Sequence, residues 1–275
     1  MHAKRAGRAI VCLALGWASG CGAPSGPGRP PRLDRAQLSD AGAVARGSFP
    51  VWTRAPREEF KQSLTLAIRD GVSGRGFEGR GVVAVRPGHA LRMILLGPGG
   101  TTAMDVWIRE GAFRVSIPPL DRIVRGDAST PKERLRGLPI GLLSRWLVSP
   151  FGGALVAAHE GRVDVEGRVI DDDATGPGGA RSFVAFLRRD GVFEARVREV
   201  SPRSIMARAW WFEHGKVVAF LAGEEQAMEG AIVPRVAHYV SLDPPMRVDV
   251  TATETARVAA GESLPPATFA DPDAP

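Results

Sequence analysis

The side chain whose chemistry the sequence indicates most clearly is the thiol of Cys21, the last residue of the segment Ala18-Ser19-Gly20-Cys21. Basic residues stand at positions 4, 5 and 8, an apolar run follows from 9 to 18, and small residues then lead to the cysteine. That order is the layout of a cleavable export signal. The alternative is a buried helix or an uncleaved membrane span, but the run has about half of the roughly 20 residues that a span needs. The segment therefore predicts cleavage directly before Cys21.

This N-terminus resembles the signal of bacterial lipoproteins, and the resemblance implies a lipid anchor. Residues 1–20 would leave, and the acylated thiol of Cys21, carrying for example palmitate, would hold the new N-terminus in membrane lipid. In proteobacterial lipoproteins an aspartate after the cysteine retains the protein at the inner membrane. Gly22 stands there instead, which implies the outer membrane, on the side that faces the periplasm.

Cleavage would also change the cysteine content and the net charge of the chain. Cys12, the other cysteine, lies within the signal, so the remaining chain would have no thiol free for a disulfide and must rest on a packed core. Residues 1–20 hold three of the 36 positive charges and none of the 30 negative ones, which leaves 33 against 30, a net charge of +3. The arginines are therefore expected on solvated faces, and no nucleic-acid partner is expected.

No other group of residues has the spacing of a catalytic or metal site. The five histidines lack metal-ligand spacing, and Ser144 and Ser201 lie in no nucleophile-elbow context. The acidic run Asp171-Asp172-Asp173 lacks the spaced oxygen ligands of a calcium loop, and the glycines after it favour a flexible hairpin tip. We expect no catalytic residues, no metal and no cofactor, since a hydrolase would need a clustered acid, base and nucleophile.

Beyond the cysteine the chain divides into a tether and a folded part. Residues 21–47 mix Pro and Gly with Ala, Ser and Arg, a composition that cannot bury enough apolar surface to offset the entropy of ordering it. They are predicted to be a flexible, lipidated tether. Residues 48–275 have the length that one sheet-built domain commonly fills.

The folded part is predicted to be mainly β, because apolar residues alternate with polar ones at period two, as at Leu91, Met93 and Leu95. Dipeptides such as Glu110-Gly111 and His214-Gly215 fit tight hairpin turns, so the strands that they join should be antiparallel. Strands are expected around 64–68, 77–86, 91–95, 104–108, 113–117, 162–170, 182–188, 192–200, 204–212, 216–222, 232–242 and 247–258. An up-and-down meander of this length should curl into an open, or half, barrel.

One segment breaks the period-two pattern and predicts a short helical insertion. Thr130-Pro131-Lys132-Glu133 fits a helix start, with Thr130 as N-cap and Glu133 completing a capping box. Because Pro139 and Gly141 interrupt the rest of this segment, two short helices are expected, over 131–137 and 139–148. Their apolar face should turn into the barrel as a plug or lid.

The middle and end of the chain resemble LolB, the family of outer-membrane lipoprotein receptors, and more loosely the wider LolA/LolB-like superfamily of open barrels. In the family a strand ends in a Pro-Leu-Gly turn before the next strand, and here residues 92–100 precede Met104-Asp105-Val106. The family's Gly-x-Pro-x-x-Leu-x-x-Trp helical pattern is similar to residues 137–147, and Pro234 introduces the last two strands. Gly99 occupies the place of the exposed leucine with which the receptor hands lipoproteins to the membrane.

The resemblance implies a half barrel whose helices cover a hydrophobic cavity for lipoprotein acyl chains. Such chains need a dry, adaptable lining with little hydrogen bonding. The candidate ligand-binding residues are Leu91, Met93, Leu95, Met104, Val106, Leu142, Leu143 and Trp146. The same side chains could simply fill the core. Two hypotheses result: a lipid-anchored envelope protein that binds lipid or lipoprotein acyl chains, in lipoprotein localisation to the outer membrane, or a structural or assembly lipoprotein that binds an envelope protein partner.

Overall fold

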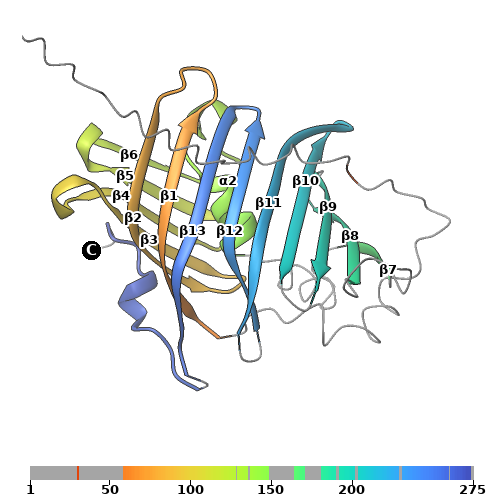
Figure 1. Ribbon diagram of the computed structural model, residues 1–275. Coiled ribbons are helices and arrows are strands. Elements are labelled where there is room, and N and C mark those ends of the chain that lie inside the picture. Colours follow the sequence, from red (N-terminus) through yellow and green to blue (C-terminus); the bar gives the residue numbers. More distant parts are fainter. Residues whose placement is uncertain are drawn as a thin grey trace, which may run out of the picture.

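The computed structural model describes residues 30, 58–127, 129–135, 137–148, 164–170, 181–189, 192–201, 204–228, 231–259 and 261–273. Its strands are β1 (Phe60–Asp70), β2 (Gly76–Arg86), β3 (Ala90–Leu96), β4 (Thr102–Arg109), β5 (Ala112–Ile117), β6 (Arg122–Gly126), β7 (Asp164–Ile170), β8 (Arg181–Arg189), β9 (Val192–Val200), β10 (Ile205–Glu213), β11 (Lys216–Met228), β12 (Ala231–Leu242) and β13 (Pro245–Arg257). Within these residues the strands form one antiparallel sheet in the order β6-β5-β4-β3-β2-β1-β13-β12-β11-β10-β9-β8-β7. The sheet curls into a half barrel with β6 and β7 as its edges (Figure 1). The predicted fold class is confirmed.

Two meanders build this sheet. Strands β1 to β6 pair with their neighbours in sequence, strands β7 to β13 do the same, and the pairing of β1 with β13 joins the two sets. The first and last strands therefore lie side by side within the sheet, and the two strands that flank the helical insertion lie at its edges.

The hairpin turns form where the dipeptides predict them. Glu110 and Gly111 have φ of 49° and 87°, and His214 and Gly215 have φ of 50° and 75°. Two successive positive φ values define the turn whose twist matches that of the flanking strands. A third dipeptide of this kind, Asp190-Gly191, and the acidic run at 171–173 lie outside the described residues.

Strand β6 was not expected from the sequence. Its five residues carry one side chain that is buried on the inner face, Val124, while Ile123 is 58% exposed. A single inward residue gives no period-two signal. This strand therefore forms through its pairing with β5 and not through a local sequence pattern.

The helical insertion differs in part from the prediction. The first expected helix is only the 3-10 turn η4 (Lys132–Leu135). The hydroxyl of Thr130 accepts a hydrogen bond from the backbone N–H of Asp127, 2.9 Å away, which precedes it in the chain. A helix N-cap would instead accept from an N–H that follows it. The second is present as α2 (Ile140–Leu142), which continues into the π-helical η5 (Leu143–Val148). None of the described helices combines the length and apolar composition needed to cross a bilayer.

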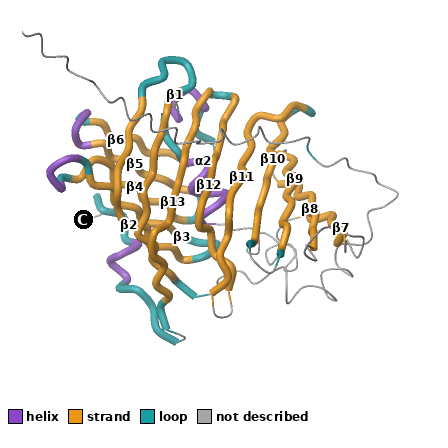
Figure 2. The backbone as a smooth tube through the Cα atoms, in the orientation of Figure 1, coloured by secondary structure: helices purple, strands orange, loops and turns teal. Residues whose placement is uncertain are grey.

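The helical segment 140–148 lies on the concave face of the sheet (Figure 2). Its buried residues share one core cluster with inward side chains of β1 to β6 and β10 to β13. The pair Trp210 and Trp211 follows strand alternation: Trp211 belongs to this inner core, whereas Trp210 packs in a separate cluster with Phe212 and Phe220. The convex face therefore carries apolar clusters of its own.

Short 3-10 turns complete the described chain. They are η2 (Pro98–Gly100), η3 (Pro118–Leu120) and η6 (Pro266–Phe269). In η6, Phe269 packs with Leu264, Ala84 and Ala90. These alanines alternate with inward residues of β2 and β3, so the C-terminal segment covers the convex side of the sheet.

Candidate functional site

A small cleft marks where the helical segment meets the concave face of the sheet. Leu142, Trp146 and Leu147 form its roof. Its floor comes from β1, β12 and β13, through Gln62, Pro234, Arg235, Val236, Ala237, Val250 and Ala252. The volume is about 10 Å³, enough for about one water molecule. In this conformation the roof is closed on the floor.

The eight candidate ligand-binding residues are all brought together in the inner core. Leu142 and Trp146 line the cleft. The others are buried side chains of the same cluster, on β3, β4 and the helical segment: Leu91, Met93, Leu95, Met104, Val106 and Leu143. Since η5 contacts β3, the candidate residues on β3 lie under the helical roof. Cys21 lies outside the described residues.

The floor of the cleft contains two polar side chains, Arg235 and the buried Gln62, and the amide nitrogen of Gln62 has hydrogen-bond partners. The amide Nε2 of Gln62 donates to the carbonyl of Pro234 at 2.6 Å and to Oγ1 of Thr255 at 3.0 Å, and Gln62 is 1% exposed. A satisfied amide offers little to a hydrogen-bonding ligand. The lining is therefore chemically suited to apolar groups.

A cation–aromatic cluster, which the sequence did not predict, lies beside the roof. The guanidinium carbon of Arg145 lies 5.5 Å from the ring centroid of Trp211, within the range of a cation–π contact. Trp211 in turn meets Tyr239 edge to face, with ring centroids 5.8 Å apart. Arg145 thus connects the helical segment with the inner faces of β10 and β12.

Tyr239 gives this cluster a measurable signature, because it is the only tyrosine in the chain. Burial raises its pKa above the ordinary value near 10, against the opposing effects of the Arg145 charge and a hydrogen bond with Ser241. We expect tyrosinate absorbance of the native protein to appear at higher pH than in urea, and Arg145→Gln to shift it higher still. Because the folded pKa is raised, this residue's contribution to stability is complete below about pH 10 and is lost above it.

An absorbance titration from pH 8 to 13 tests this expectation. Arg75→Gln, at an exposed turn, is the matched control and should leave the titration unchanged. Equal midpoints for the native protein and the urea-unfolded chain would contradict the burial of this phenol.

The inner face also contains an ion pair that corrects the expectation of solvated arginines. Arg198 on β9 and Glu225 on β11 are joined by Nε and Oε2 at 2.6 Å, and both side chains are 0% exposed. In the strand register Arg198 lies opposite Ala207, and Ala207 opposite Gly223, so two small residues leave room for the contact across β10. Arg114, with 8% of its side chain exposed, is likewise not solvated.

The described side chain pair most like an acid–base pair lies away from the cleft. His238 Nδ1 and Asp249 Oδ1 are 2.7 Å apart, and both residues alternate with inward side chains, which places them on the convex face. Burial opposes ionisation of Asp249, but hydrogen bonds from His238 and Arg247 prevail and lower its pKa. Within the described residues no group of three or more His, Cys, Asp or Glu side chains could hold a metal ion.

Comparisons with known proteins define the class of fold. No family model matches this sequence, and no curated protein matches it either. A DUF1329 family protein from Desulfovibrio piger superposes with a TM-score of 0.52 at 10% identity, over 85% of this chain and 97% of that one. The LolA superfamily protein NE2245 from Nitrosomonas europaea superposes with a TM-score of 0.51 at 10% identity, over 85% of this chain and 98% of that one. The chain has the LolA-like open-barrel fold, and this likeness does not single out LolB within it.

Proposed function

We propose that this protein binds acyl chains of lipids or lipoproteins on the concave face, under the helical segment 140–148. The observation that supports the proposal is an apolar roof closed on a mainly apolar floor, with the cleft between them. Lipid anchoring through Cys21 would place this site beside the outer membrane, facing the periplasm, where such ligands occur. The protein would then act in lipoprotein localisation.

Binding requires the roof to move. Small-molecule pockets usually have about 300–1,000 Å³, far more than the cleft now offers. The contacts that hold the roof are mainly apolar, together with a backbone hydrogen bond of 2.6 Å from Gly88 N–H to the Val148 carbonyl at its end. Acyl chains can replace apolar contacts without leaving polar groups unpaired. Lifting the roof would uncover the candidate residues on β3.

A fluorescent fatty acid provides the direct test. Ala252→Leu adds three carbon atoms to the floor of the cleft and is expected to weaken probe binding at least tenfold. Ala67→Leu is the matched control, because Ala67 pairs with Asp249 on the convex side of the sheet and should leave binding unchanged. Equal probe affinity for both variants and the wild type, or no binding by any of them, would contradict the proposed site.

The anchor is tested separately by the mass of the membrane-extracted protein. A chain that begins at Cys21 and carries acyl groups is expected. An unmodified or uncleaved N-terminus would overturn lipid anchoring and leave the concave-face proposal standing on the probe measurement alone.

The second candidate function is a structural or assembly lipoprotein, and the nearly filled interior favours it. A filled half barrel needs no ligand and would act through its surface on an envelope protein. In that case the wild type should fail to bind the acyl probe and should retain a stoichiometric envelope protein in a pull-down.

A further inference from the structure

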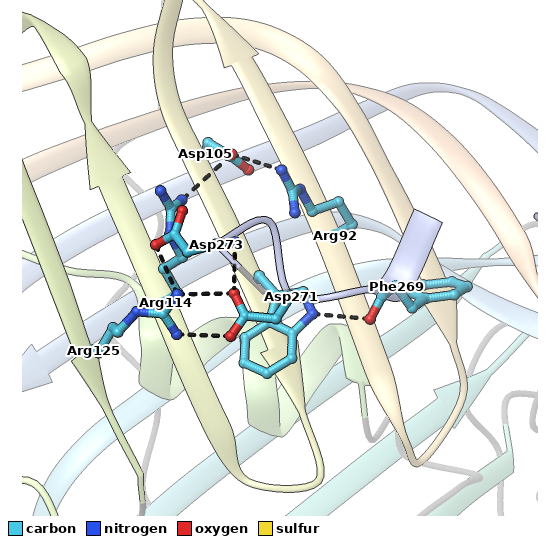
Figure 3. A network of polar contacts seen from close by, with 8 residues as sticks. Arg92, Asp105, Arg114, Arg125, Phe269, Asp271 and Asp273 are labelled. Carbon is cyan, nitrogen blue, oxygen red and sulfur yellow. Dashed lines mark hydrogen bonds and ion pairs between the residues drawn. The ribbon is translucent and has the colours of Figure 1, made fainter. Parts of the chain in front are cut away.

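The last residues of the described chain form a strap across the convex face, opposite the cleft. We define the C-terminal strap as residues 261–273, which follow β13 and contact the outer side of β2 to β6. Figure 3 shows its last part, with Phe269, Asp271 and Asp273. Leu264 and Phe269 anchor it, with 6% and 1% of their surface exposed, against Ala84 and Ala90. The strap is therefore packed against the sheet through buried apolar side chains.

Two arginines of the sheet hold the carboxylates of the strap. Arg125 donates from Nη1 and Nη2 to both oxygens of Asp271, at 2.9 and 2.8 Å, and from Nη2 to Asp273 at 2.7 Å. Arg114 donates from Nε to Asp273, also at 2.7 Å. Paired bonds of this kind fix the direction as well as the charge of a carboxylate. Figure 3 shows these contacts side by side with those of Arg92.

The arginines are oriented by a carboxylate within the sheet. Asp105 lies 2.7 Å from Arg92 and 3.6 Å from Arg114. Burial raises the pKa of Asp105, and the two arginines oppose that rise. With Arg125 included, the sheet alone presents three positive charges and one negative charge, so the two carboxylates of the strap bring this surface to neutrality.

Other side chains contact the backbone and the aromatic ring of the strap. The indole N–H of Trp107 donates to the carbonyl of Phe269 at 3.0 Å, and Arg86 lies over the Phe269 ring, 4.7 Å from its centroid. Glu59 accepts from the backbone N–H of Leu264 at 2.6 Å. The surface thus recognises a peptide by its main chain, one aromatic side chain and two carboxylates.

The ion pairs of the strap predict release by acid. Hydrogen bonds from Arg125 lower the pKa of Asp271 to about 2, and those from Arg114 and then Arg125 lower the pKa of Asp273. Since the folded pKa values are lowered, strap docking is fully supported above about pH 4 and is lost as pH falls towards 2. We expect pepsin to cut within the strap faster at pH 2 than at pH 4, relative to a reference peptide, with the increase reduced in Arg125→Gln.

We propose that the convex surface formed by Trp107, Arg114 and Arg125 is a binding site for a short acidic peptide of the pattern Phe-x-Asp-x-Asp, and that the strap is its resident occupant. A partner that carries this pattern would displace the strap. The indole donor to a backbone carbonyl and the cradle of the aromatic ring favour a peptide over a lipid headgroup, which offers neither group. The proposal concerns the convex face and is independent of acyl-chain binding.

The test uses the full chain and a labelled peptide with the sequence of residues 262–275. In Asp271→Asn/Asp273→Asn the strap loses its carboxylates, and this variant is expected to bind the peptide at least tenfold more tightly than the wild type does. Adding Arg125→Gln should abolish the gain, whereas Arg80→Gln, an exposed arginine on the same convex face, should preserve it. A peptide with both aspartates changed to asparagine should not bind.

A measurement on the wild type keeps the test independent of the variants' folding. Excess peptide is expected to release the strap and increase its proteolysis severalfold. A strap that stays protected at saturating peptide, or peptide binding that does not depend on Arg125, would overturn the proposal. Binding of phosphatidylglycerol vesicles by the strap variant without any binding of the peptide would also overturn it, since this convex surface would then recognise a lipid surface.

Discussion

Replacing Glu225 with alanine is expected to destabilise the fold by about 3–5 kcal/mol, because it removes the carboxylate that pairs with the buried charge of Arg198. Both side chains are 0% exposed, so neither charge is in contact with bulk water. The expected result is a lower midpoint of urea unfolding with an unchanged slope, followed by tryptophan fluorescence. This is one of the two largest effects that the structure predicts.

Two controls isolate the cause. Glu224→Ala removes the neighbouring carboxylate, which is 42% exposed and pairs with Arg235 at 3.2 Å, and it should cost at most about 1 kcal/mol. Arg198→Met/Glu225→Leu removes both buried charges and should recover most of the loss. If Glu225→Ala costs no more than Glu224→Ala, the pair is not desolvated and the buried ion pair is excluded.

The same ion pair shows where prediction from sequence stops. Period-two alternation located the strands well, since Leu91, Met93 and Leu95 all face the core as expected. In β9 the alternation is inverted: Ala195 and Val197 belong to the convex cluster of Trp210, and Arg198 faces inward. Alternation identifies the core-facing side of a strand only where the other side is exposed to solvent, and here both sides are buried.

The strap was missed for a related reason. Leu264 and Phe269 are isolated apolar residues among prolines, with neither helical nor strand periodicity. Their partners Arg114 and Arg125 stand at outward positions of β5 and β6, where the sequence indicates ordinary solvated charges. Only the long-range contact, from the outer face of β5 and β6 to Asp271 and Asp273, gives these residues a role.

The helical segment was predicted correctly as a covering element, but its sequence pattern did not indicate its contact with the second meander. Leu142 and Trp146 fall on one face, as the spacing requires, and that face closes the cleft. Arg145, on the neighbouring face, contacts Trp211 on a strand far away in sequence. A cation–aromatic contact therefore connects the roof to the second meander.

Replacing Trp146 with alanine is the second large expected effect, and it combines stability with binding. The side chain is 1% exposed and its indole N–H has no hydrogen-bond partner among the described residues, so it contributes packing rather than a polar contact. Truncation of a buried tryptophan should cost about 3–5 kcal/mol. Because Trp146 borders the cleft, the truncation also enlarges it, and we expect at least tenfold tighter binding of a small fluorescent acyl probe.

Trp210→Ala is a closely matched control. Trp210 is also a tryptophan with 1% exposure and an unpartnered indole N–H within the described chain, but it packs with Ala195 and Val197 on the convex side. It should lose comparable stability with no gain in probe binding. Equal gains in both variants would mean that the probe follows loosened packing anywhere in the molecule. A gain confined to Trp146→Ala would locate the apolar site between the helical roof and the floor formed by β1, β12 and β13.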